Sequence, residues 1–193
     1  KHKKNITIIK GGAIMPPETI LNVGNSGTTA RMLLGLFCGQ QIKAKLTGDK
    51  SLCLRPMRRI IKPLTAMGAE IQSSNFRFPV EINRGVSKQI NYKKKTKSAQ
   101  VKSSLMFAGL GINQYSSISY DKQTRNHTEN FLNFAGYDIQ INRNILIRKS
   151  FVKTGFNITI PGDLSNASFI IAAAIITPNS RVTIKNILYN ESR

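Results

Sequence analysis

Apolar residues follow two alternating patterns along the chain, and together they predict a protein built from both helices and strands. Apolar residues at helical spacing come after Asn25, Ser98 and Ser165 in the sequence, and two further helical runs end at Gly68 and Gly136. Short β-branched or alternating runs between them predict strands over residues 6–9, 42–46, 71–72, 117–120, 139–141, 145–147, 156–160 and 181–184. Because alternating strands and helices pack as layers, the expected fold class is α+β with α/β layers.

The helical runs recur at a regular interval, which indicates an internal repeat of about 70 residues. Each of the two glycines follows a helical run and precedes a strand, as a left-handed glycine at a helix C-terminus does. We therefore predict repeated units in which strands alternate with two helices. The third unit stops at Arg193 before its second helix, and the chain begins at Lys1 rather than Met. A fold that is incomplete at both ends is expected.

Hydropathy places the chain among globular proteins. Its most apolar stretch, residues 169–176, is much shorter than the ~20 residues that span a membrane. Residues 1–5 lack the apolar segment of a secretory signal, so a cytoplasmic protein without membrane contact is expected. Cys38 and Cys53 lack the spacing and the nearby histidines of a zinc site, which favours reduced thiols and no metal.

The charge is strongly positive, with 29 Lys and Arg residues against 9 Asp and Glu, a net +20. Such an excess attracts polyanions, so a nucleic-acid-binding protein remains an alternative. However, the basic residues are scattered, with one compact run at residues 93–97, and the chain has no Trp for base stacking. Small phosphorylated ligands would suit a positive cleft equally well.

Three helix starts are candidates for anion binding. Residues 25–29 read Asn-Ser-Gly-Thr-Thr and open an apolar helix, so backbone N–H groups and hydroxyls there could receive an anion. An ordinary N-cap is the alternative. Residues 98–100 (Ser-Ala-Gln) and 165–166 (Ser-Asn) occupy equivalent places. If these starts converge on one cleft, they would form a phosphate receptor.

Two loops that lead into helices carry further candidates. Arg55 precedes Pro56, which suits a first helical turn, and its guanidinium could hold a phosphate or carboxylate in bidentate fashion. Judged alone, it could equally be a surface arginine. Residues 124–129 make the corresponding junction in the second unit, where His127 is interpreted as a structural histidine.

Several of these segments together resemble one family. They are residues 21–32, 46–69, 98–110, 124–132 and 161–174. Leu-Thr-Gly-Asp at residues 46–49, followed by Arg-Pro-Met at residues 55–57, is the most distinctive part. The chain resembles an internal piece of a 5-enolpyruvylshikimate-3-phosphate synthase (3-phosphoshikimate 1-carboxyvinyltransferase). The resemblance implies two domains of three βαββαβ units each, with residues 1–161 forming most of one domain and residues 162–193 the first piece of the other.

The resemblance also implies an activity. The family transfers the enolpyruvyl group of phosphoenolpyruvate to shikimate 3-phosphate in chorismate and aromatic amino acid biosynthesis. It implies no metal or organic cofactor, two small anionic substrates as partners, and a whole enzyme that is monomeric. The family's acid–base residues have no counterpart here, so no catalytic residue is expected in this piece, which alone should be inactive.

Binding residues follow from the resemblance position by position. For phosphoenolpyruvate these are Asn25, Gly27, Thr28, Arg55 and Gln100. For shikimate 3-phosphate these are Ser98, Ala99, Gln100, Thr124 and Arg125. Asn126 departs from the family's pattern, which more often has Asp there.

Three alternatives are weighed against this interpretation. The related transferase that acts on UDP-N-acetylglucosamine has a reactive cysteine before the matching arginine, but Cys53 lacks that context. A basic nucleic-acid-binding module, or an RNA-phosphate-cyclase-like protein on a similar repeat, would show salt-sensitive RNA affinity. A remnant that binds nothing is the third.

Overall fold

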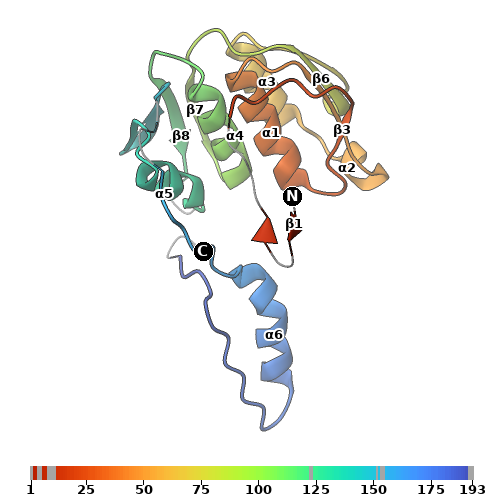
Figure 1. Cartoon of the computed structure of the whole chain (residues 1–193), viewed down its shortest axis with the longest axis vertical. Coiled ribbons are helices and arrows are strands. Elements are labelled where there is room, and N and C mark those ends of the chain that lie inside the picture. Colours follow the sequence, from red (N-terminus) through yellow and green to blue (C-terminus); the bar gives the residue numbers. More distant parts are fainter. Residues whose placement is uncertain are drawn as a thin grey trace.

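The computed structural model describes residues 2–3, 6–7, 12–121, 124–150, 152 and 155–190. The strands are β1 (His2–Lys3), β2 (Ile6–Thr7), β3 (Leu21–Asn22), β4 (Ala44–Thr47), β5 (Glu70–Ser74), β6 (Arg77–Arg84), β7 (Asn91–Thr96), β8 (Ser116–Tyr120), β9 (Ile139–Ile141) and β10 (Asn144–Ile147). The helices are α1 (Gly27–Gly39), α2 (Lys50–Leu54), α3 (Arg58–Ala66), α4 (Ala99–Gly109), α5 (His127–Phe134) and α6 (Leu164–Ile176). Strands and helices form layers, with α1 and α4 side by side between the sheets (Figure 1).

Two four-stranded sheets share one topology, which confirms the predicted repeat. Their strand orders are β3-β4-β6-β5 and β7-β8-β10-β9. In each sheet the first pair is parallel and the other two pairs are antiparallel. The layered α+β class is also confirmed. The order within a unit is βαβαββ rather than the predicted βαββαβ, because both helices precede the closing strand pair.

The closing strands of the first unit are joined by a tight hairpin. β5 and β6 are joined by Asn75 and Phe76, both with positive φ (48° and 56°), as a two-residue primed hairpin turn requires. The glycine usual in such turns is absent here, so the turn could not be recognised from its residues. Gly68 and Gly136 do adopt the left-handed conformation predicted for them, with φ of 94° and 82°.

Several predicted element boundaries were wrong. β6 and β7 were missed, since β6 contains a proline and β7 is rich in lysine. Residues 156–160 and 181–184 are not strands, because no neighbouring strand pairs with them within the described ranges. Helix α3 begins at Arg58 instead of Pro56, and the expected loop before it holds the five-residue helix α2. Residues 8–9 of the first predicted strand lie outside the described residues.

The core is formed where the two units meet, and there the backbones of α1 and α4 approach each other closely. A Cβ added to Gly35 would lie 2.0 Å from the backbone oxygen of Ser104, and one added to Gly39 would lie 2.5 Å from that of Phe107. Glycine is therefore required at both positions for this spacing. Leu34 and Leu105 are fully buried in the same core.

Both cysteines carry free thiols. Burial raises the pKa of the Cys38 thiol to about 12, so this group stays protonated. Within the described ranges, no cluster of three or more His, Cys, Asp or Glu residues could hold a metal ion. In the same part of the chain, every helix is too short or too polar to cross a bilayer.

The last described segment extends away from the layered body (Figure 1). Its helix α6 begins after the N-cap Asp163, whose side chain accepts a hydrogen bond from Ser165 N at 3.0 Å. Phe169, Ile175 and Ile176 are each more than three-quarters exposed. An apolar helix with this exposure lacks the covering layer that a globular fold provides.

Candidate functional site

Two equivalent helix starts converge at one end of the layered body. The Ser26 hydroxyl caps α1 by accepting from Thr29 N at 3.2 Å. The Ser98 hydroxyl caps α4 by accepting from Val101 N at 3.4 Å. The predicted convergence is confirmed for these two starts. It is wrong for residues 165–166, which lie on α6 at a distance from the other two (Figure 1).

Side chains from the two starts are joined directly. Gln100 Nε2 donates to Thr28 Oγ1 at 2.6 Å, and Gln100 Oε1 accepts from Arg31 Nη1 at 2.6 Å. Arg31 Nη1 also donates to the Gly27 carbonyl at 3.2 Å. One arginine therefore fixes both the glycine at the start of α1 and the amide at the start of α4.

A second network orients Arg55. Its Nη2 donates to Asn25 Oδ1 at 2.5 Å and to Ser51 Oγ at 3.3 Å. Asn25 Nδ2 in turn donates to Asp49 Oδ2 at 2.6 Å, while Asp49 Oδ1 accepts from Leu52 N at 2.7 Å. The Leu52 N–H, assisted by Asn25 and by the charge of Arg55, holds the pKa of Asp49 below its usual range.

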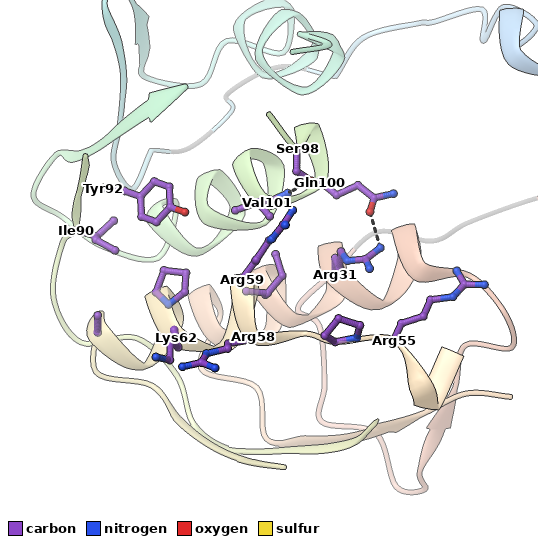
Figure 2. A pocket seen from close by; sticks show the side chains of 14 residues that line it. Arg31, Arg55, Arg58, Arg59, Lys62, Ile90, Tyr92, Ser98, Gln100 and Val101 are labelled. Atoms are coloured by element: carbon purple, nitrogen blue, oxygen red, sulfur yellow. Dashed lines mark hydrogen bonds between the residues drawn. The ribbon is translucent and has the colours of Figure 1, made fainter. Parts of the chain in front are cut away.

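The first cavity is a basic groove of about 1010 Å³ that includes Arg31, Arg55 and Arg59 in its wall (Figure 2). Burial, followed by the charges of Arg55 and Arg59, lowers the pKa of Arg31. Arg58 and Lys62 also line the groove, and their cationic groups lie 5.3 and 6.0 Å from the centroid of the Phe76 ring. The wall contains no carboxylate among the described residues, so an anion would meet positive charge alone.

Two smaller cavities continue from the start of α4. One, of about 360 Å³, is lined by Lys97, Ser98, Ala99, Gln100, Thr124 and Arg125. The other, of about 190 Å³, is lined by Thr28, Met32, Ala99, Gln100, Ser103, Arg125, His127 and Thr128. Gln100 lines all three cavities. The residues predicted to hold shikimate 3-phosphate thus share one cavity, and Gln100 connects it to the groove beside Arg55.

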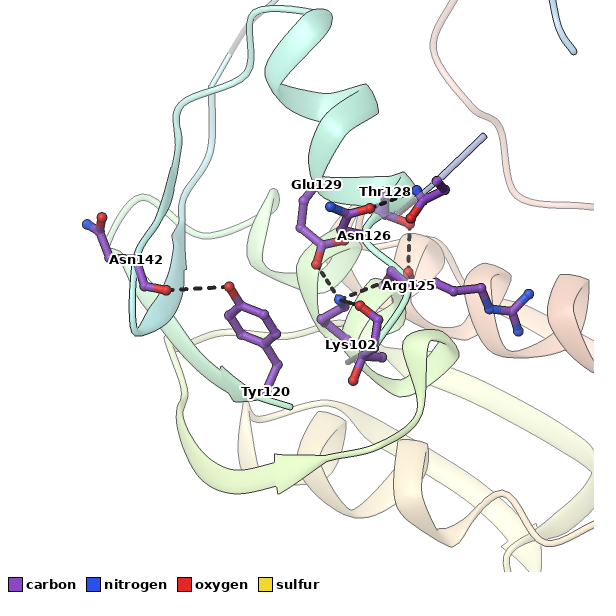
Figure 3. A network of polar contacts seen from close by, with 10 residues as sticks. Lys102, Tyr120, Arg125, Asn126, Thr128, Glu129 and Asn142 are labelled. Carbon is purple, nitrogen blue, oxygen red and sulfur yellow. Dashed lines mark hydrogen bonds and ion pairs between the residues drawn. The ribbon is translucent and has the colours of Figure 1, made fainter. Parts of the chain in front are cut away.

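A buried polar cluster lies next to the second cavity, the one of about 360 Å³ that Thr124 and Arg125 line (Figure 3). Lys102 Nζ donates to the carbonyls of Thr124 (3.3 Å) and Arg125 (2.9 Å) and forms an ion pair with Glu129. The lysine lies 4.9 Å from the centroid of the Tyr120 ring. Burial, followed by the nearby charge of Glu129, raises the pKa of Tyr120.

Asn126 accepts a hydrogen bond from another segment, whereas an N-cap asparagine usually accepts one from the backbone of its own helix. It is the N-cap residue of α5, but its Oδ1 accepts a hydrogen bond at 2.9 Å from Nδ2 of Asn190 in the last described segment. This amide pair links the α5 start to the segment that follows α6.

The sequence-based predictions left out several residues of this region, among them Arg31, Arg59, Lys97, Lys102 and Glu129. Helical spacing could have revealed two of them. Arg31 and Lys102 each lie one turn after a residue of a helix start, on the face that points back toward it. Arg59 and Glu129 gave no such signal, because their places depend on how separate helices pack.

Comparison with known proteins identifies the family. The sequence model of the family described as EPSP synthase (3-phosphoshikimate 1-carboxyvinyltransferase) matches residues 1–193. The chain belongs to the EPSP synthase family. A 3-phosphoshikimate 1-carboxyvinyltransferase of Thermoanaerobacter sp. (strain X514) is 41% identical over 186 residues. The corresponding protein of Endomicrobium trichonymphae is 42% identical over 172 residues.

Solved structures agree with this family assignment. An EPSP synthase from Acinetobacter baumannii superposes with a TM-score of 0.72 and 38% identity, covering 83% of this chain and 38% of that one. The match to the Thermoanaerobacter relative covers 95% of this chain and 44% of the relative. The chain therefore spans less than half the length of the family members that it matches.

Proposed function

We propose that this chain supplies the anion-binding part of an enzyme that transfers the enolpyruvyl group of phosphoenolpyruvate to shikimate 3-phosphate. The observation that carries this proposal is the continuous hydrogen-bonded contact from Arg31 through Gln100 to Thr28, which joins two helix starts beside Arg55. Family membership supports the same reaction. The product would be 5-enolpyruvylshikimate 3-phosphate, a precursor in chorismate and aromatic amino acid biosynthesis.

In this proposal phosphoenolpyruvate binds at the start of α1. Gly27 is buried and lacks a side chain, so its backbone can approach the ligand closely, while Asn25 and Thr28 shape the loop. Arg55 binds the phosphate or carboxylate with a guanidinium that Asn25 already orients. Gln100 contacts both substrates from the shared wall.

Shikimate 3-phosphate occupies the cavity at the start of α4. Ser98, Ala99 and Gln100 offer a helix N-terminus, which favours a phosphate group. Thr124 and Arg125 close the opposite side, and Arg125 is exposed to the cavity and able to pair with the phosphate. A neutral ligand of the same shape would gain neither interaction.

The chemistry assigns this chain one of two tasks. The substrate hydroxyl adds to phosphoenolpyruvate, and the tetrahedral intermediate then expels phosphate. The arginines and helix starts neutralise and orient the anionic groups. Protonation and deprotonation of the methylene carbon require acid–base groups, which we place in the parts of the enzyme that this chain does not span.

The proposal extends to the organisation of the whole protein. Residues 1–161 form most of one domain, and residues 162–193 are the first piece of a second one. The exposed apolar side chains of α6 support this division, because the rest of a second domain would cover them. The enzyme is proposed to be a cytoplasmic monomer that binds no nucleic acid.

Calorimetric titration of the chain with shikimate 3-phosphate tests the proposal. Arg125→Ala should weaken binding about tenfold or more, because it removes a charged partner of the phosphate. Arg143→Ala is the matched control, since it removes the same charge from an exposed turn that lines no described cavity. Saturable RNA binding at about 0.15 M salt, with no binding of shikimate 3-phosphate, would instead favour a nucleic-acid-binding module.

Activity is tested in a polypeptide that joins this chain to the parts of the Thermoanaerobacter relative that it does not span. There Arg55→Ala should raise the KM for phosphoenolpyruvate at least tenfold, and Arg143→Ala should not. An unchanged KM in a folded Arg55→Ala protein would contradict the assigned role.

A further inference from the structure

Lys102 is a fully buried lysine that donates two hydrogen bonds to the loop before α5. Its side chain is 0% exposed, and that of its ion-pair partner Glu129 is 1% exposed. The remaining contacts of the ammonium group are the carbonyl oxygens of Thr124 and Arg125, at 3.3 and 2.9 Å. Of the three polar contacts of this ammonium group, two are hydrogen bonds to the loop and one is the ion pair.

Stability alone does not account for such a group. Removing two charges from water is costly, and an apolar pair of similar volume is often equally or more stabilising. The pair is also neutral as a whole, so it adds little net charge to the nearby cavity. What the lysine adds that an apolar residue cannot is a pair of hydrogen bonds to the backbone just before α5.

The loop that it holds forms one wall of the second cavity. Lys102 lies one turn into α4, and Ser98 at the start of the same helix lines the cavity opposite Arg125. Glu129 lies in the first turn of α5, so the ion pair also fixes the helix that follows the loop. A single side chain thereby joins α4 to the loop before α5 and to the first turn of that helix (Figure 3).

We propose that Lys102 is a positioning residue: its ammonium group orders the backbone of Thr124 and Arg125 so that the Arg125 side chain meets the phosphate of the bound substrate. This inference rests on the proposed function, in which that cavity receives shikimate 3-phosphate. Lys102 touches no substrate, and its effect is to preorganise the loop before binding.

Two variants separate positioning from stability. Lys102→Met with Glu129→Leu replaces the buried pair by apolar side chains, which keeps the fold but removes the bonds to the loop. Glu129→Gln keeps the lysine and its bonds to both carbonyls. Titration with shikimate 3-phosphate should show about tenfold weaker binding for the double variant and less than about threefold for Glu129→Gln. Circular dichroism and the urea midpoint report whether each variant is folded.

A double-mutant cycle with Arg125→Ala provides a readout that a merely structural residue would not change. If Lys102 acts through Arg125, then Arg125→Ala should cost less affinity in the double variant than in the natural chain. Additive losses would overturn the inference, as would a folded double variant that binds as tightly as the natural chain. If the double variant does not fold, a tenfold loss in folded Glu129→Gln would overturn it instead. Failure of Arg125→Ala to weaken binding in the natural chain would refute the proposed function itself.

Discussion

Replacing Gly35 by alanine should force the two central helices apart. The added Cβ would lie 2.0 Å from the Ser104 backbone oxygen and 2.7 Å from the carbonyl carbon. Ordinary contact distances for such pairs exceed about 3.2 Å, so α1 and α4 must separate by roughly 1 Å, since no rotamer change can relieve a backbone clash. Overpacking of this kind costs about 3 kcal/mol, and alanine's higher helix propensity returns about 1 kcal/mol. We expect a net loss of ~2 kcal/mol.

The same displacement should reach the site. The contacts from Gln100 to Thr28 and to Arg31 are both 2.6 Å long, and an added ~1 Å would weaken both, because hydrogen bonds fade beyond about 3.5 Å. Urea unfolding followed by circular dichroism measures the stability, and titration with shikimate 3-phosphate measures the binding. Gly155→Ala is the matched control, because its Cβ would meet nothing within 4 Å. A Gly35→Ala protein as stable as the natural chain would refute this account of the helix packing.

Three further outcomes are expected. Gly27→Ala places a Cβ 2.8 Å from Arg31 Nη1 and 3.3 Å from Arg55 Nη1. Since both arginine side chains are flexible and can move, the urea midpoint of the variant should stay nearly unchanged. In the joined polypeptide its KM for phosphoenolpyruvate should rise about tenfold, and an unchanged KM would contradict this prediction. The pKa of Asp49 is lower in the folded chain than its usual 3.8, so its stabilising contribution is present above that pH and is lost as pH falls through the folded value. Asp49→Asn should therefore flatten the acid side of the stability profile, measured by thermal melts between about pH 5 and 2.5. Cys38, with its raised pKa, should resist iodoacetamide at about pH 8 until the chain is unfolded, and mass spectrometry of native and denatured samples checks this.

Local signals made much of the repeat predictable. Gly68 and Gly136 end helices as glycine does at a left-handed position, and the serines at residues 26 and 98 cap the two helices of the site. Hydrophobic periodicity located α1, α3 and α4, since each of these helices packs apolar side chains into the common core. These features depend on a few neighbouring residues, which is why the sequence alone reveals them.

Features that depend on packing between units were not predictable. β7 carries lysines that favour an exposed loop, yet it pairs in parallel with β8. The burial of Lys102 cannot be predicted from its neighbours in the sequence, because the carbonyls and the carboxylate that allow it come from residues more than 20 positions away. Arg59 likewise enters the site only because α3 packs beside α4.

The hydrogen bond between Thr28 and Gln100 bears on how such a protein could evolve. The two residues are 72 positions apart and stand at the second position of α1 and of α4, so they occupy the same place in two copies of one unit. A duplicated gene begins with identical side chains at such places. Two threonines at the same backbone spacing would be too short to meet across the gap. An ancestor with threonine at both places would therefore have lacked this bridge, and the divergence of one copy to glutamine supplies it.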